Sequence, residues 1–287
     1  MTPQYKQLYN RALKTYSPKF KKELQAQVDT FVRTQDYSKI SSKGISDTLY
    51  SLHLAMGIPM AQFSYKSVKK GLKSHIPDEH KSFLTDLWNN VIIRYLNYRG
   101  LADMVQNITD TTKEQIRRFI VKGTTEGLTL NQTIKNLKTA GITDYRAALI
   151  ARTETGRAAN TGSLVGAIST GIQTNKIWIS TLDSRTRIIP PDKFDHWNMD
   201  RIEIPIDENF QVYSLEGTDY MMYPCDLTGS AGNTCNCRCT IGYRVVKDEN
   251  NDYISYQDSP PMGDAGKIWS LLTDNNNNNI YNAISKP

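Results

Sequence analysis

The sequence lacks any apolar run that approaches the roughly 20 residues a membrane-spanning helix needs. Its first ten residues, MTPQYKQLYN, also lack the apolar stretch typical of a secretory signal peptide. These absences predict a protein that is made in a cytoplasm and has no membrane partner. Any location outside a cell would then come from assembly into a particle.

Cysteine is scarce and unevenly placed. The 287 residues contain 4 cysteines, none of them among the first 224 residues. That number is too small for the disulfide scaffold of a secreted protein of this length. All of them fall within fifteen positions, at Cys225, Cys235, Cys237 and Cys239. This clustering favours one local site over a general stabilisation of the fold.

Proline is sparse in residues 1–140, where Lys, Leu, Gln and Ala are frequent, so this region is predicted to be helical. The expected helices span residues 3–15, 18–34, 45–56, 79–97, 101–123 and 130–140. A longer, alanine-rich helix is expected to start after Thr143 and to end near Gly171.

After Gly171 the pattern changes to short segments bounded by prolines, which indicates strands. The expected strands span residues 176–181, 202–204, 210–213, 220–223 and 237–246. The predicted fold class is therefore α+β: a helical N-terminal region, then a small domain in which a long helix packs on a short irregular β-sheet. We expect domains at 1–140 and 141–250, and a flexible, Asn-rich tail at 251–287 that includes the pentamer Asn275–Asn279.

Charge is distributed unevenly along the chain. Residues 1–100 carry 16 Lys and Arg against 7 Asp and Glu, whereas residues 201–287 carry 6 against 12. A basic first part suggests an anionic partner, either nucleic acid or an acidic protein surface. The alternative is a solvated helical surface that is rich in lysine.

Several short motifs follow one another between residues 144 and 244. The first is IARTET, residues 150–155, followed by Asn160. The next is Trp178 on an expected strand, which leads into the turn DSRTR with Asp183, Arg185 and Arg187. The later landmarks are His196 in DHWNMD, Phe210 in IDENF, Asp226 in YPCD, and the NCRC run Asn236, Cys237, Arg238 and Cys239.

In this order the motifs resemble those of the phage Mu protein F-like family of minor head, or head morphogenesis, proteins. The resemblance covers roughly a third of the chain and assigns residues 141–250 to a Mu F-like domain. It implies a virion protein present in a few copies at the portal vertex or inside the head. The implied partners are the portal protein, major capsid or scaffold proteins and, through the basic N-terminal half, packaged double-stranded DNA.

Two motif arginines and two acids suggest structural ion pairs. Glu154 and Arg157 are three residues apart on the expected long helix and can pair. Arg152 lies on another side of this helix, where we expect it to reach Asp183 and fix the helix on the sheet. Arg185 and Arg187 could bind a phosphate or a carboxylate, or could be solvated. His53 carries no motif and is expected to be incidental.

The sharpest chemical question concerns His196 and the cysteines. If residues 235–239 form a strand, then Cys235, Cys237 and Cys239 share one face. With His196, and with Cys225 or Cys235 as the fourth ligand, Cys237 and Cys239 could bind zinc in a tetrahedral site. Free thiols in a small core rank before zinc, and a disulfide ranks after it.

Two other functions compete with the structural one. A metal-dependent hydrolase would use His196, Asp183 and the cysteines, but the sequence has no HExxH, GxSxG or P-loop motif. A DNA-binding virion protein would use the basic helical half. We therefore predict a structural protein that is not an enzyme and has no catalytic residues.

Overall fold

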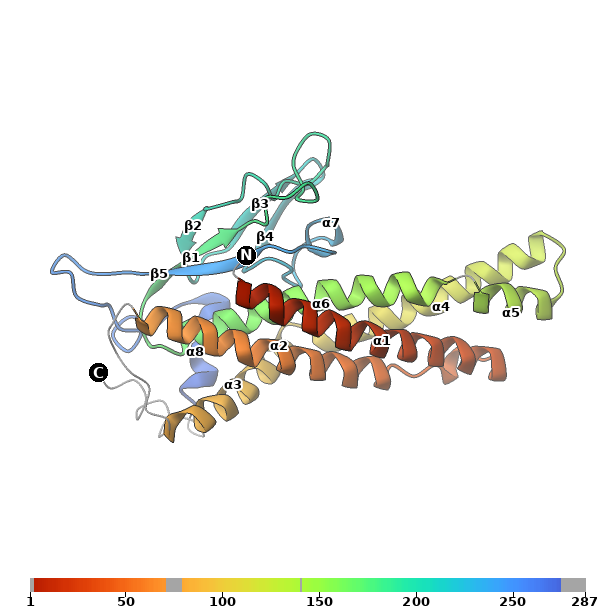
Figure 1. Ribbon diagram of the computed structural model, residues 1–287, viewed down its shortest axis with the longest axis horizontal. Coiled ribbons are helices and arrows are strands. Elements are labelled where there is room, and N and C mark those ends of the chain that lie inside the picture. Colours follow the sequence, from red (N-terminus) through yellow and green to blue (C-terminus); the bar gives the residue numbers. More distant parts are fainter. Residues whose placement is uncertain (1–2, 71–78, 140, 275–287) are drawn as a thin grey trace.

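The computed structural model describes residues 3–70, 79–139 and 141–274, and it confirms the predicted α+β class. The first part comprises α1 (Pro3–Thr34), the 3-10 turn η1 (Tyr37–Lys39), α2 (Lys43–Lys70), α3 (Glu79–Tyr98), α4 (Leu101–Thr125), α5 (Leu130–Thr139) and α6 (Ile142–Ile168). The second part comprises β1 (Thr174–Ile179), β2 (Glu203–Pro205), β3 (Phe210–Ser214), β4 (Gly217–Met221), α7 (Ala231–Thr234), β5 (Thr240–Val245) and α8 (Gly263–Leu272). Figure 1 shows the strands at one end of a layer of long helices and the α4–α5 hairpin at the other end.

Helix α1 is continuous through Pro18, so the prediction of two helices at 3–15 and 18–34 was wrong. Its buried side chains recur every three or four residues on both sides of this exposed proline, as at Tyr16 and Phe20. A proline inside a helix costs about 3 kcal/mol. Burial of the whole apolar stripe against α2 and α6 outweighs that cost. Helix α2 likewise continues past Pro59 to Lys70, beyond the expected end at residue 56.

Helices α2 and α6 pack so closely that their backbones touch. A Cβ atom at Gly162 would lie 2.1 Å from the Gly57 carbonyl oxygen, and one at Gly166 would lie 2.1 Å from that of Ala61. Only glycine fits at such an approach. The seam therefore joins a helix of the expected domain 141–250 to one of the expected region 1–140. The division of the chain into these domains stays a prediction.

The sheet is small and antiparallel, with the strand order β2–β1–β5. The β3–β4 hairpin forms a separate two-stranded sheet. The buried face of β1 carries Thr174, Lys176 and Trp178. The Lys176 ammonium donates to the Met222 carbonyl oxygen at 2.9 Å, and burial lowers the pKa of Lys176 to about 7.

Helix α8 lies within the segment 251–287 that was expected to be a flexible tail. Its Ala265, Ile268 and Leu272 are buried in the same hydrophobic cluster as the α3, α6 and strand residues. Arg99, in the turn after α3, pairs with Asp264 at the start of this helix. The run Asn275–Asn279 lies outside the described residues. Within the described part of the chain, no helix combines the length and the apolar character needed to cross a membrane.

Candidate metal centre and its surrounding motif contacts

Two loops and one helix bring the motif residues together. The first loop joins β1 to β2 and carries His196, whose backbone N–H donates to the Arg187 carbonyl oxygen at 3.0 Å. The second joins β4 to β5 and carries all four cysteines. Helix α6 lies beneath both. Its Asn160 side chain donates to the carbonyl oxygens of Pro224 and Cys239 at 2.9 and 3.2 Å.

His196, Cys237 and Cys239 form one buried group. The His196 Nδ1 atom lies 3.4 Å from the Cys237 Sγ and 3.7 Å from the Cys239 Sγ, and all three atoms lie within 4.8 Å of one another. The three residues are 1%, 2% and 3% exposed. Nitrogen and sulfur donors of this kind could hold a metal ion such as zinc.

The imidazole of His196 is held from its other side. Its Nε2 atom lies 3.1 Å from the Asn233 Oδ1 atom, and the Asn233 Nδ2 atom donates to the Asp219 carboxylate at 2.7 Å. Because Asn233 uses its amide hydrogen on Asp219, its oxygen faces the histidine and can accept only from Nε2–H. A neutral His196 in this contact therefore presents a lone pair at Nδ1 to the two sulfur atoms. The Trp178 ring packs edge-on against the imidazole, with the ring centres 5.5 Å apart.

Burial and neighbouring thiols raise the pKa values of two of the buried cysteines, Cys237 and Cys239. The contact with the Cys225 thiol, together with burial, raises the pKa of Cys237. The contact with Cys237, together with burial, raises the pKa of Cys239. Such thiols are chemically unreactive unless a cation draws off their protons.

The four cysteines are all free and differ in position. Cys225 is fully buried, and its Sγ donates to the Cys237 carbonyl oxygen at 3.5 Å. Cys235 is half-buried, caps α7 and accepts a bond from Arg187 through its carbonyl oxygen. The strand expected at 237–246 begins only at Thr240, after α7 at residues 231–234, so Cys235, Cys237 and Cys239 do not share a strand face.

The ion pair expected on the long helix is present and completely buried. Glu154 pairs with Arg157, and Arg157 also donates to the Cys225 carbonyl oxygen at 2.7 Å. Burial opposes ionisation, but the guanidinium of Arg157 holds the pKa of Glu154 below its usual value. His53 of α2 lies 3.3 Å from the same carboxylate, so its expected incidental role was wrong. Sequence reasoning missed it because the two residues are 101 positions apart.

The partner of Asp183 is Arg238 of the NCRC run. The two side chains form a two-point contact, with Nη2 2.6 Å from Oδ1, and this hydrogen bonding lowers the pKa of Asp183. The expectation that Arg152 reaches Asp183 was wrong, because the Arg152 Nε atom donates to the Ala148 carbonyl oxygen of its own helix. Arg185 points into solvent beside Asp183.

Arg187 and Asn236 hold the second loop. Arg187 donates to the Cys235 carbonyl oxygen at 2.6 Å, so it turns inward while Arg185 faces outward. The backbone N–H of Asn236 donates to the Thr153 hydroxyl of α6 at 3.1 Å. Both contacts join segments that are far apart in the sequence.

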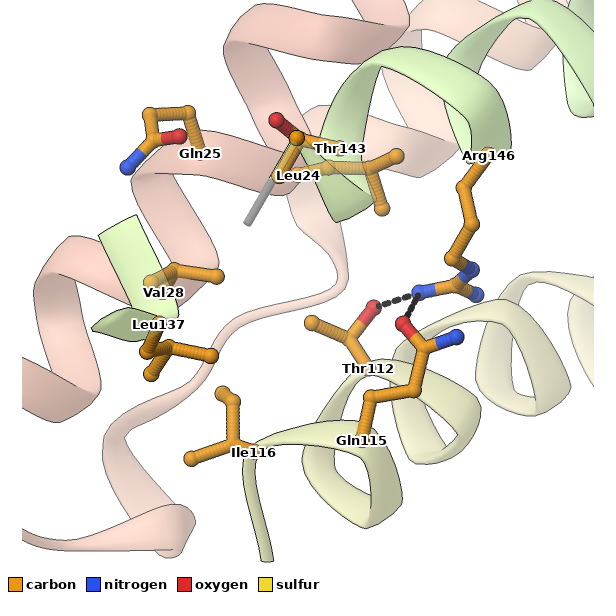
Figure 2. A pocket seen from close by; sticks show the side chains of 10 residues that line it. Leu24, Gln25, Val28, Thr112, Gln115, Ile116, Leu137, Thr143 and Arg146 are labelled. Atoms are coloured by element: carbon orange, nitrogen blue, oxygen red, sulfur yellow. Dashed lines mark hydrogen bonds between the residues drawn. The ribbon is translucent and has the colours of Figure 1, made fainter. Parts of the chain in front are cut away.

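A hollow at the junction of α1, α4, α5 and α6 lies away from these residues (Figure 2). Arg146 reaches across it to Thr112 at 2.7 Å and Gln115 at 3.4 Å. Apolar side chains, among them Leu24, Val28 and Ile116, form much of the rest of the wall. None of the motif residues lines this hollow, so it is not part of the candidate metal centre.

Comparison with known proteins finds a family match over part of this chain. Residues 114–242 match the family model described as phage Mu protein F like protein. The resemblance drawn from the order of the motifs is thereby confirmed, and residues 114–242 form a Mu F-like segment. No curated protein and no solved structure matches the chain.

Proposed function

We propose that this chain is a structural minor head protein of a tailed bacteriophage. It would assemble at the portal vertex or on the inside of the head, and act in head assembly and in genome packaging or delivery. The observation that carries this proposal is the match of residues 114–242 to the Mu F-like family. Members of this family are generally structural head proteins, so the proposed partners are portal, capsid or scaffold proteins.

The contacts that the motif side chains make support a structural role over a hydrolytic one. Arg157, Asn160 and Arg238 each bond to a part of the fold that is distant in the sequence. A hydrolase built on His196 and Asp183 would need both groups to face one substrate. Asp183 is instead held by Arg238, while His196 faces the two buried thiols.

The test is co-expression of the full chain with the portal protein of the same phage, followed by mass determination of the purified complex. We expect a stable complex with a fixed whole-number ratio, and recovery of the chain from purified virions. A chain that stays monomeric beside the portal protein and is absent from virions would contradict the proposal. An unrelated protein of similar positive charge serves as the control for non-specific attraction.

A second candidate role, contact with packaged DNA, has a specific observation in its favour. The outer side of α1 carries a set of exposed cations, namely Lys6, Arg11, Lys14, Lys19 and Lys22. Cations on an exposed helix face attract the phosphate backbone without regard to base sequence.

Binding of duplex DNA at several salt concentrations tests this second role. Replacement of Lys14, Lys19 and Lys22 by Gln should weaken binding and flatten its dependence on salt. The matched control replaces Arg117, Arg118 and Lys122 of α4 by Gln, since these cations pair with Glu114 and Glu126. Equal losses in both variants, or no binding at low salt, would remove α1 as a DNA contact.

A further inference from the structure

We propose that His196, Cys237 and Cys239 bind a structural zinc ion and that Cys225 supplies the fourth ligand. This site goes beyond the proposed assembly role and does not depend on it. The ion would join the β1–β2 loop to two points of the β4–β5 loop above α6.

The spacing of the donor atoms fits zinc. Zinc–sulfur bonds of about 2.3 Å and zinc–nitrogen bonds of about 2.0–2.1 Å, at tetrahedral angles, separate the N and S ligand atoms by about 3.6 Å. The distances from His196 Nδ1 to the Cys237 and Cys239 Sγ atoms are 3.4 and 3.7 Å. The two distances from the histidine therefore match the separation that one ion would require, and the two Sγ atoms lie within 4.8 Å of each other.

The contacts behind the histidine are those that orient a metal ligand. The Asp219–Asn233–His196 chain fixes the ring and leaves Nδ1, not Nε2, for an ion. The ligand atom selected in this way is the one that faces both sulfur atoms.

Burial argues for a fourth ligand from the protein. Structural zinc sites are closed by four protein ligands, whereas catalytic sites keep a position open to water. Cys225 is 0% exposed and lies against the Cys237 backbone, so its side chain can complete the set. Cys235 is the less suitable fourth ligand, because it is only half-buried, at the C-terminal end of α7.

Binding would change the protonation of the site in a defined way. Zinc ligands must be deprotonated, so three thiols would each release a proton on metal binding while His196 stays neutral. Three thiolates and Zn²⁺ give a net charge of −1. The guanidinium of Arg157, bonded to the Cys225 carbonyl oxygen, lies next to this charge.

The first experiment measures metal bound to the full-length protein, purified without chelators from cells grown with added zinc. We expect one zinc ion per chain, and tetrahedral cobalt–thiolate absorption after exchange with Co²⁺. A protein that contains no zinc and gives no such absorption would overturn the proposal.

Single variants then locate the ligands. Cys237→Ser and His196→Ala should lose the metal, and Cys225→Ser should lose part of the cobalt–thiolate absorption. Cys235→Ser is the matched control and should bind as the unmodified protein does. Asn233→Ala should weaken zinc affinity by about 10–100-fold through its effect on the histidine.

Three outcomes would count against the assignment. Equal metal loss in Cys235→Ser and Cys237→Ser would overturn the ligand set, and full cobalt absorption in Cys225→Ser would overturn the fourth ligand. If the ligand variants do not fold, a chelator is added to the unmodified protein. Its melting temperature should fall and should recover with Zn²⁺ but not with Mg²⁺, whereas no change on chelation would overturn a structural zinc ion.

Discussion

Two ion pairs with the same local pattern lie in opposite parts of this molecule. Glu154 and Arg157 on α6 are three residues apart, and so are Glu114 and Arg117 on α4. The side chains of the α6 pair are 4% and 5% exposed, whereas those of the α4 pair are 42% and 64% exposed. The pattern in the sequence is identical, so surroundings alone set what each pair contributes.

The surroundings differ because the two helices differ in their neighbours. Helix α6 lies between α1, α2 and the strands, and small residues let the α2 backbone reach it. The outer part of α4 packs on α5, and Val121 at this end is 60% exposed. Charges at the centre are therefore part of the core, while charges at the end of the hairpin are solvated.

The largest expected effect comes from Arg157→Ala. This change leaves Glu154 buried beside His53 alone, and removal of one partner from a buried ion pair costs about 3–5 kcal/mol. Arg117→Ala removes the same kind of partner from an exposed pair and should cost less than about 1 kcal/mol. Urea unfolding of both variants measures the difference.

Arg157→Lys refines this comparison. Lysine keeps the charge but cannot form the two contacts that the guanidinium makes with Glu154 and the Cys225 carbonyl oxygen. We expect a loss between those of the two alanine variants. Equal losses of stability in Arg157→Ala and Arg117→Ala would contradict the prediction, because they would show that burial does not change what the ion pair contributes.

The next effect concerns the α2–α6 seam. Gly162→Ala would place a Cβ atom 2.1 Å from the Gly57 carbonyl oxygen, and a backbone atom cannot rotate away. Overpacking of this kind costs about 1–3 kcal/mol, and here we expect the upper part of that range. Gly57→Ala is the control, because its nearest neighbour is the flexible Ile92 Cδ1 atom at 3.2 Å. Thermal unfolding should show a large loss for the first variant and almost none for the second.

Some of these features could be predicted from the sequence alone, and others could not. Most helices and the Glu154–Arg157 pair could be predicted because their signals are local, with spacings of three or four residues. The pairing of Asp183 with Arg238 and of Glu154 with His53 could not, because no local spacing relates residues so far apart. The placement of Cys235 and Cys237 on one face failed because it required a strand, and the chain has a turn there between α7 and β5.

Lys176 gives a stability effect that depends on pH. Its pKa is about 7 in the folded protein, below the ordinary value near 10.4 of an unfolded chain, so the unfolded state binds more protons between these values. Stability should therefore rise with pH from 7 to 10, by up to about 1.4 kcal/mol per pH unit. Lys176→Met should flatten this rise in urea unfolding measured from pH 7 to 9. A rise of equal slope in both proteins would assign it to another group.

The last prediction concerns the partly buried pair of Asp183 and Arg238, for which a small loss of stability is expected. Asp183 and Arg238 have side chains that are 37% and 15% exposed, between those of the α6 and α4 pairs. Asp183→Asn should therefore cost about 1 kcal/mol at neutral pH, the upper end for exposed pairs, because the contact is two-pointed. Since the folded pKa of Asp183 is lowered, its contribution is present above the unfolded pKa and is lost as pH falls through the folded one. The difference in unfolding free energy between the unmodified protein and Asp183→Asn should shrink toward acid pH and at high salt. A loss of stability as large as that of Arg157→Ala would contradict this prediction, because it would show that Asp183 depends on its partner as much as a fully buried group does.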